Sequence, residues 1–166
     1  MVLGMTVAQF TVFHVVISMI AIFAGFIVVG GMFADAGLAV WTVFFLVMTI
    51  LTNITGFMFP FGGFTPAIAV GVISTLLLLL ALVALYGFHL HGRWRLAFVS
   101  TAVLGLYLNV FVMIAQSFQK VSFLKPLAPN GSEPPFVIAQ AVNLVGFALL
   151  GWMAAKAFQP KRKIVA

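Results

Sequence analysis

Five long runs of apolar residues, separated by short segments rich in glycine, proline or charge, make up nearly the whole chain. Each run has about the 20 residues that an α-helix needs to cross a hydrocarbon core of about 30 Å. Helix-breaking residues such as Pro60 and Pro160 end the runs. We therefore expect membrane-spanning helices over residues 6–31, 38–59, 66–88, 96–119 and 136–158. The pattern predicts an all-α bundle of five transmembrane helices, forming one domain over residues 1–166.

The composition excludes a water-soluble domain and several kinds of chemistry. Of all residues 64% are hydrophobic and only 6% are charged, whereas soluble proteins carry about 25% charged residues. The lipid bilayer is therefore the expected surrounding. The chain has no Cys, which excludes disulfides, thiolate nucleophiles and cysteine-held iron–sulfur clusters. The few basic residues stand at the ends of apolar runs, so we expect no nucleic-acid partner.

The distribution of Lys and Arg predicts an orientation. Five spans place the connector 89–95 and the C-terminal tail on one side of the membrane. That side holds Arg93, Arg95, Lys156, Lys161, Arg162 and Lys163, and the other holds Lys120 and Lys125. Cytoplasmic loops carry the excess of basic residues. We therefore expect the N-terminus outside and the C-terminus in the cytoplasm.

Amide and imidazole side chains within the predicted helices gather in the outer half of the membrane. Polar groups without a partner cost several kcal/mol in hydrocarbon, so we expect these side chains to face inward. The predicted ligand-binding residues are His14, Asn53, Asn109, Gln116, Gln140 and Asn143. They would form one pocket between four helices, with Lys120 and Glu133 at its mouth. Its aromatic walls would come from Phe10, Phe57, Phe59 and Phe111.

His14 gives this pocket its chemistry, because an ionisable residue within a span is by default a functional hypothesis. A neutral His14 could donate a hydrogen bond to a quinone carbonyl or take up a proton. It could also ligate haem or copper, with Met58 or Met113 as a soft second ligand. A haem held by His14 and His89 is geometrically poor, since His89 stands at the opposite membrane surface. The leading prediction is a membrane protein that binds quinone or haem, within electron transport.

An alternative reading needs no ligand. Asn, Gln, Ser and Thr commonly join membrane helices by hydrogen bonds, and the chain then serves as an accessory subunit of a larger, respiratory-type complex. With so little mass outside the membrane, we expect a homo-oligomer or other membrane subunits as partners. A small transporter is disfavoured because no charged relay crosses the membrane. No catalytic motif of a hydrolase or transferase is present, so no catalytic residue is assigned.

The short basic connector between the third and fourth spans predicts a contact with lipid. His89, His91, Arg93 and Arg95 stand together at the inner membrane surface. Such clusters bind anionic lipid headgroups and help to set the topology. A metal site is not favoured here, because the segment holds no acidic residue.

Four segments resemble small uncharacterised multi-spanning proteins of proteobacterial inner membranes. They are residues 55–61 (TGFMFPF), 116–121 (QSFQKV), 127–129 (LAP) and 132–136 (SEPPF). The resemblance extends over most of the chain and implies a multi-pass protein of a bacterial inner membrane. No activity is attached to that group, so the resemblance assigns no site residue.

Overall fold

The computed structural model describes residues 1–36, 38–60 and 62–159, and these form an all-α bundle without a strand. Its five long helices are α1 (Val7–Phe33), α2 (Ala39–Phe57), α3 (Pro66–Leu82), α4 (Arg93–Lys120) and α5 (Pro134–Ala157). A π-helical turn, η1 (Val83–Gly87), extends α3, and a short 3-10 helix, η2 (Lys125–Leu127), lies between α4 and α5. All five helices are long and apolar enough to cross a membrane, counting α3 with η1 as one. The chain is therefore a multi-pass membrane protein by length and composition.

Helix ends follow local chemistry. Thr6 caps α1 through a capping box with Gln9, and Thr65 caps α3 just before Pro66. A proline is tolerated there because the first turn of a helix has no partner for its N–H groups. For the same reason α5 already begins at Pro134, two residues before the expected start. The helix α4 also begins earlier than expected, at Arg93.

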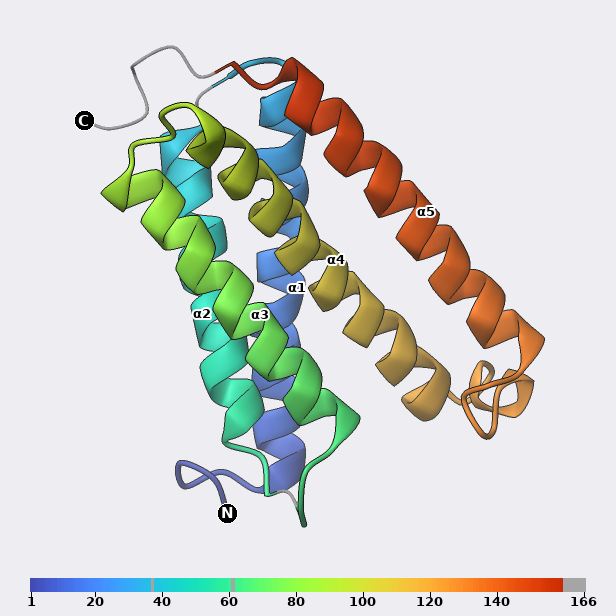
Figure 1. The fold of residues 1–166 in the computed structure, drawn as a ribbon. Coiled ribbons are helices and arrows are strands. Elements are labelled where there is room, and N and C mark those ends of the chain that lie inside the picture. Colours follow the sequence, from blue (N-terminus) through green and yellow to red (C-terminus); the bar gives the residue numbers. More distant parts are fainter. Residues whose placement is uncertain (37, 61, 160–166) are drawn as a thin grey trace.

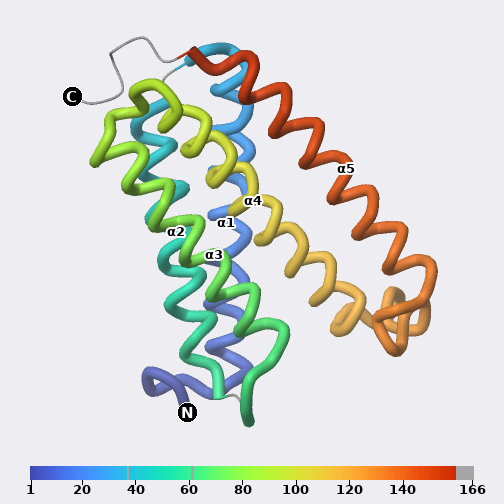
Figure 2. The backbone as a smooth tube through the Cα atoms, in the orientation of Figure 1, coloured from blue at the N-terminus to red at the C-terminus, as the bar shows by residue number. Residues whose placement is uncertain are grey.

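The helices pack in sequence order, with α4 at the centre of the contacts. It touches α3, α5 and α1, while α2 lies between α1 and α3. Figures 1 and 2 show α5 lying against α4 on the side away from α2 and α3. At the end that carries the N-terminus, α4 and α5 lean away from the other three helices. We call this the N-terminal end of the bundle, and the opposite end the C-terminal end.

The apolar core fills the middle of the bundle and its C-terminal end. Phe45, Phe98, Val99 and Leu106 are almost wholly buried there. Helix α1 comes close to this core at Gly25, where an added Cβ would lie 2.7 Å from Cδ1 of Leu106. Only glycine allows so close an approach.

The C-terminal end is closed by a strained turn and by ties to α5. His89 and Leu90 both have positive φ angles, which side-chain-bearing residues rarely adopt. This turn places Leu90 inside the bundle, where 6% of its surface is exposed. Arg95 donates hydrogen bonds to the carbonyl oxygens of Ala155 and Phe158, the first at 2.8 Å. The end of α5 is thereby fixed to the start of α4.

Candidate functional site

His14 lies half-buried on α1, two turns from the start of the helix, and faces α2. Its Nδ1 is 2.7 Å from Oγ1 of Thr55, a buried residue of α2. The ring of Phe59 stands perpendicular to the imidazole, with centroids 5.3 Å apart and an angle of 88° between the planes. Two contacts therefore fix where the imidazole lies and how it is turned.

The hydroxyl of Thr55 determines which nitrogen of His14 carries the proton. Oγ1 of Thr55 is also 2.7 Å from the carbonyl oxygen of Leu51. Two oxygens so close need a proton between them, and the hydroxyl has only one. It donates that proton to Leu51, so towards His14 it acts as acceptor. With the hydroxyl acting in this way, a neutral imidazole would carry its proton on Nδ1 and keep a lone pair on Nε2.

Nε2 of His14 is not completely buried. It makes no hydrogen bond to any described residue and is not among the buried polar atoms that lack a partner. Gly56 lies beside the ring, and a Cβ there would be 3.6 Å from Cε1 of His14. A longer side chain at Gly56 would cover the imidazole. We name His14, Thr55, Gly56 and Phe59 the His14 site.

Aromatic rings surround this site, partly as expected. Phe10 is completely buried and packs on Phe59, with centroids 5.0 Å apart. Phe57 instead packs towards Gly71 of α3, and Phe111 packs on Tyr107 of α4. Of the four predicted wall residues, the structure therefore places Phe10 and Phe59 at His14.

Asn53 forms a separate tie between α2 and α3. Its Nδ2 donates to Oγ1 of Thr75 at 3.2 Å, and its Oδ1 accepts from Oγ of Ser74 at 3.1 Å. Both ends of the amide thus have partners on one neighbouring helix. Asn53 acts as a link between helices and points away from α1.

Two amides, those of Gln140 and Asn143, lie on the side of α5 that faces α4. The rings of Phe118 and Phe136, and those of Tyr107 and Phe147, pack across the helix pair with centroids 5.6 and 5.8 Å apart. Gln140 and Asn143 are three residues apart and share this side of α5, whereas Asn109 is two residues from both Tyr107 and Phe111 and so points away from α5. Nε2 of Gln140 donates to the carbonyl oxygen of Phe111 at 3.1 Å. We call Gln140 and Asn143 the amide cluster.

Three buried polar atoms, two in the amide cluster and one in Asn109, have no partner among the described residues. They are Nδ2 of Asn109, Oε1 of Gln140 and Nδ2 of Asn143. Asn143 is the most buried of the three residues, with 8% of its surface exposed. A free donor of this kind costs about 1–3 kcal/mol when it is removed from water.

The His14 site and the amide cluster lie at different depths. Phe147 of α5 packs on Phe26 of α1, with centroids 6.0 Å apart, which puts Asn143 near the level of Ile22. Eight residues separate Ile22 from His14, about 12 Å along a helix. Gln116 lies half-buried on α4, one turn before Lys120. The six predicted ligand residues are thus divided between the His14 site, the α2–α3 link and the helices α4 and α5, where Asn109 and Gln116 do not face Gln140 and Asn143.

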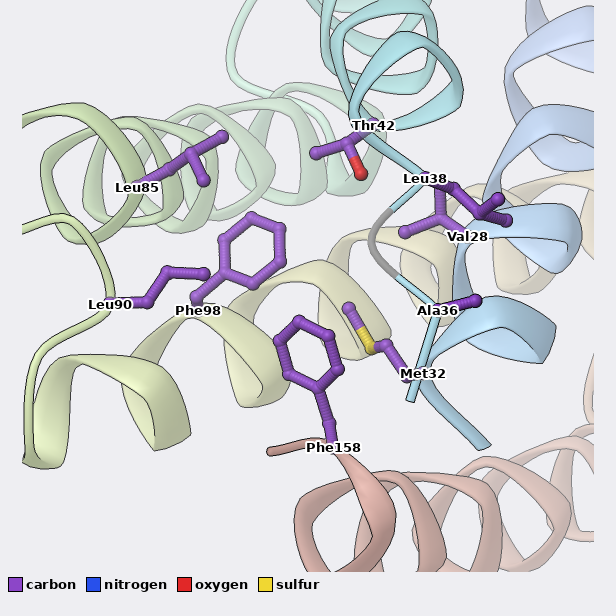
Figure 3. A pocket seen from close by; sticks show the side chains of 9 residues that line it. All are labelled: Val28, Met32, Ala36, Leu38, Thr42, Leu85, Leu90, Phe98 and Phe158. Atoms are coloured by element: carbon purple, nitrogen blue, oxygen red, sulfur yellow. The ribbon is translucent and has the colours of Figure 1, made fainter. Parts of the chain in front are cut away.

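Two small cavities lie elsewhere in the bundle. The one shown in Figure 3 lies at the C-terminal end, where Leu90, Phe98 and Phe158 turn towards it. The other lies in the core beside Ser74 and Thr101. Each encloses about 10 Å³, roughly the size of one water molecule. None of the six predicted ligand residues lines either cavity.

The two methionines considered as metal ligands take ordinary packing positions. Met58 ends α2 one turn after Thr55 and is half-buried. Met113 packs against the apolar core. Within residues 1–36, 38–60 and 62–159, no group of three His, Cys, Asp or Glu side chains is placed to hold a metal ion.

Three of the four residues predicted to bind lipid headgroups are exposed on the basic connector and at the start of α4. His89, His91 and Arg93 are exposed in the turn before α4 and on its first residue. Arg95 is half-buried, and its guanidinium is turned towards the end of α5. Lys161, Arg162 and Lys163 lie outside the described residues.

Glu133, expected at the mouth of the pocket, instead organises the loop before α5. Its carboxylate accepts hydrogen bonds from the backbone and side-chain amides of Asn130, at 3.0 and 2.8 Å, and from the backbone amide of Ser132 at 3.0 Å. Loss of hydration raises the pKa of the carboxyl, but the hydrogen bonds together outweigh it. The pKa of Glu133 consequently lies below its ordinary value.

Sequence reasoning missed Thr55 and the role of Arg95. Thr55 follows Thr49 and Thr52 at spacings of three, and all three are buried on one face of α2. That repeat was a usable signal for a polar contact with another helix. Nothing in the sequence distinguishes Arg95 from the neighbouring Arg93, since the difference depends on where α5 ends.

Comparisons with known proteins identify no relative of this chain. No protein-family model, no curated protein and no solved structure matches the chain.

Proposed function

We propose that the chain is a membrane-embedded binding protein that holds a lipid-soluble ligand at His14, and that it serves electron transport. The observation that carries this proposal is the orientation of the His14 imidazole and the hydrogen bonding of its two nitrogens. Thr55 and Phe59 fix its orientation, and its Nε2 is not completely buried and has no hydrogen-bond partner among the described residues. A residue that only joined two helices would not need an unpaired nitrogen at the edge of the bundle.

The ligand class we propose first is a quinone, in either of its redox forms. Its ring suits the aromatic surroundings of Phe10 and Phe59, and its polar oxygens suit a hydrogen bond with the imidazole. Its long apolar tail remains in the lipid beside α1. Neither of the two cavities described above lies at His14, and a ligand bound at the surface of the helices needs no enclosed cavity.

Haem is a second candidate, supported by the hydrogen bond at Nδ1. Histidines that ligate a metal nearly always donate their other ring N–H to an acceptor that fixes the tautomer. The donation from Nδ1 of His14 to Thr55 follows that pattern. A Soret band in the purified protein that is lost in His14→Leu would favour haem over a quinone.

Purification in a mild detergent, followed by solvent extraction and mass spectrometry, tests the proposal. The wild type should retain a quinone-class compound, and His14→Leu should lose it. His89→Leu is the matched control, because His89 is exposed at the other end of the bundle. The proposal would be refuted if His14→Leu retained the quinone-class compound, or if only phospholipid were extracted from the wild type.

An accessory subunit is the alternative function, supported by the exposure of α5. In the most apolar 18-residue stretch of α5 only 17% is buried, compared with 44% in the corresponding stretch of α4. Such a surface suits lipid as well as a second protein, either another copy or a different membrane subunit. Native mass spectrometry in the same detergent distinguishes a single chain, a homo-oligomer and a mixed complex.

We also propose a bacterial inner membrane, with the N-terminus outside and the C-terminus in the cytoplasm. Among the described residues, Arg93, Arg95 and Lys156 stand at the C-terminal end of the bundle, and cytoplasmic ends carry such an excess. The chain has no Cys, so the labelling of a single introduced cysteine shows on which side of the membrane that residue lies. In intact cells an impermeant maleimide should label Ser132→Cys and leave His91→Cys unlabelled. The reverse result would contradict the orientation.

A further inference from the structure

We infer that the His14 site selects the hydroxyl form of its ligand, a hydroquinone, over the carbonyl form, a quinone. This inference rests on the proposed function and deepens it. Nε2 of His14 offers a lone pair, so it can accept a hydrogen bond from a ligand O–H. A quinone carbonyl has no proton to give and needs a donor instead.

The selectivity follows from the contacts of Thr55. To donate from Nε2, the imidazole would have to move its proton away from Nδ1. Thr55 would then have to turn its own proton towards Nδ1, and the carbonyl oxygen of Leu51 would face an oxygen at 2.7 Å with no proton between them. The second carbonyl near Thr55, that of Thr52 at 3.2 Å, already competes for the same proton. Binding a quinone therefore requires giving up a buried hydrogen bond.

The environment strengthens this preference. Thr55 is 5% exposed, so water does not replace the bond that the switch would break. No acidic side chain stands on the neighbouring helix turns to hold a protonated imidazole, since the two carboxylates of the chain are Asp35 and Glu133. Binding makes and breaks no covalent bond, and the hydroxyl proton stays on the ligand oxygen.

The test uses three short-chain compounds of the same ring: a 1,4-benzohydroquinone, its quinone and its dimethyl ether. Affinities are measured by equilibrium binding to the purified protein under argon at pH 8, above the ordinary imidazole pKa of about 6.5. The hydroquinone should bind about tenfold more tightly than the quinone, which corresponds to 1.4 kcal/mol. The ether, which lacks the O–H, should bind no better than the quinone.

Two variants of Thr55 show whether this residue sets the preference. Thr55→Val removes the hydroxyl at nearly the same size, so the ratio of affinities should fall towards one. Thr55→Ser keeps the hydroxyl and should keep the ratio. A ratio that persists in Thr55→Val would overturn the assignment of the tautomer to Thr55.

The outcomes separate this inference from the proposed function. Equal affinities for hydroquinone and quinone in the wild type, lost together in His14→Leu, would overturn the inference and leave the function standing. Tighter binding of the quinone would also overturn it. Failure of all three compounds to bind would refute quinone binding at His14 and the inference with it.

Discussion

Replacing Asn143 by leucine should stabilise the protein, whereas the same change at Asn53 should destabilise it. Nδ2 of Asn143 is buried and has no partner within the part of the chain that the structure describes, and the residue is 8% exposed. The amide of Asn53 is bonded at both ends, to Thr75 and Ser74. The two residues are chemically identical, so the sign of the effect depends only on their surroundings.

The magnitudes follow from these contacts. A buried polar group without a partner costs about 1–3 kcal/mol, so Asn143→Leu should raise the free energy of unfolding by about that amount. At Asn53 two hydrogen bonds are lost, each contributing about 0.6 kcal/mol between membrane helices. The buried hydroxyl of Ser74 also loses its acceptor. A net loss of about 1–2 kcal/mol is expected.

Unfolding in mixed micelles, titrated with a denaturing detergent, measures both variants against the wild type. A destabilisation in Asn143→Leu as large as that in Asn53→Leu would refute the reasoning. It would mean that Asn143 has a partner outside the described contacts, such as a bound molecule or another chain. The amide cluster would then be a second binding site.

Three further predictions concern the packing, the ties at the helix ends and the pH dependence. Gly25→Ala should cost about 1–3 kcal/mol because the new Cβ would lie 2.7 Å from Cδ1 of Leu106. At Gly30 a new Cβ would have no described atom within 4 Å, so Gly30→Ala should gain up to about 1 kcal/mol. Thermal melts of the two variants measure both effects, and equal shifts would contradict the packing. Arg95→Met should lower the free energy of unfolding by about 1.5–3 kcal/mol and speed hydrogen exchange at the end of α5, and unchanged exchange would show that the hydrogen bonds of Arg95 do not hold that end. Because the pKa of Glu133 is lower in the folded chain, its stabilisation is complete above the ordinary pKa of about 4.3 and disappears as the pH falls through the lowered value. Glu133→Gln should therefore melt at a lower temperature than the wild type at pH 7 and with a smaller decrease in acid, and identical acid melting curves would contradict the role of the carboxylate.

The fold could be predicted because the bilayer imposes a length on every apolar run. The five helices lie where the runs do, and the differences at Arg93 and Pro134 arise where polar or proline residues continue a helix beyond its apolar part. The tilt of α5 could not be predicted. It depends on the register of packed rings such as Phe147 against Phe26, which no local pattern encodes.

The candidate site was only partly predictable. His14 and Asn53 are conspicuous because imidazole and amide groups are rare in apolar helices. Their partners Thr55, Ser74 and Thr75 are not, since threonine and serine also bond the carbonyls of their own helix. Depth along each helix could be estimated from the sequence, but which face meets which helix could not. This is why one expected pocket became three separate places.

Nitrogen-15 NMR of the histidine-labelled protein in lipid tests the central claim most directly. At pH 8 the resonances of His14, identified by their loss in His14→Leu, should show a protonated Nδ1 and an unprotonated Nε2. In Thr55→Val this single tautomer should give way to a mixture. A protonated Nε2 in the wild type would contradict the account, because His14 would then offer a donor in place of a free lone pair.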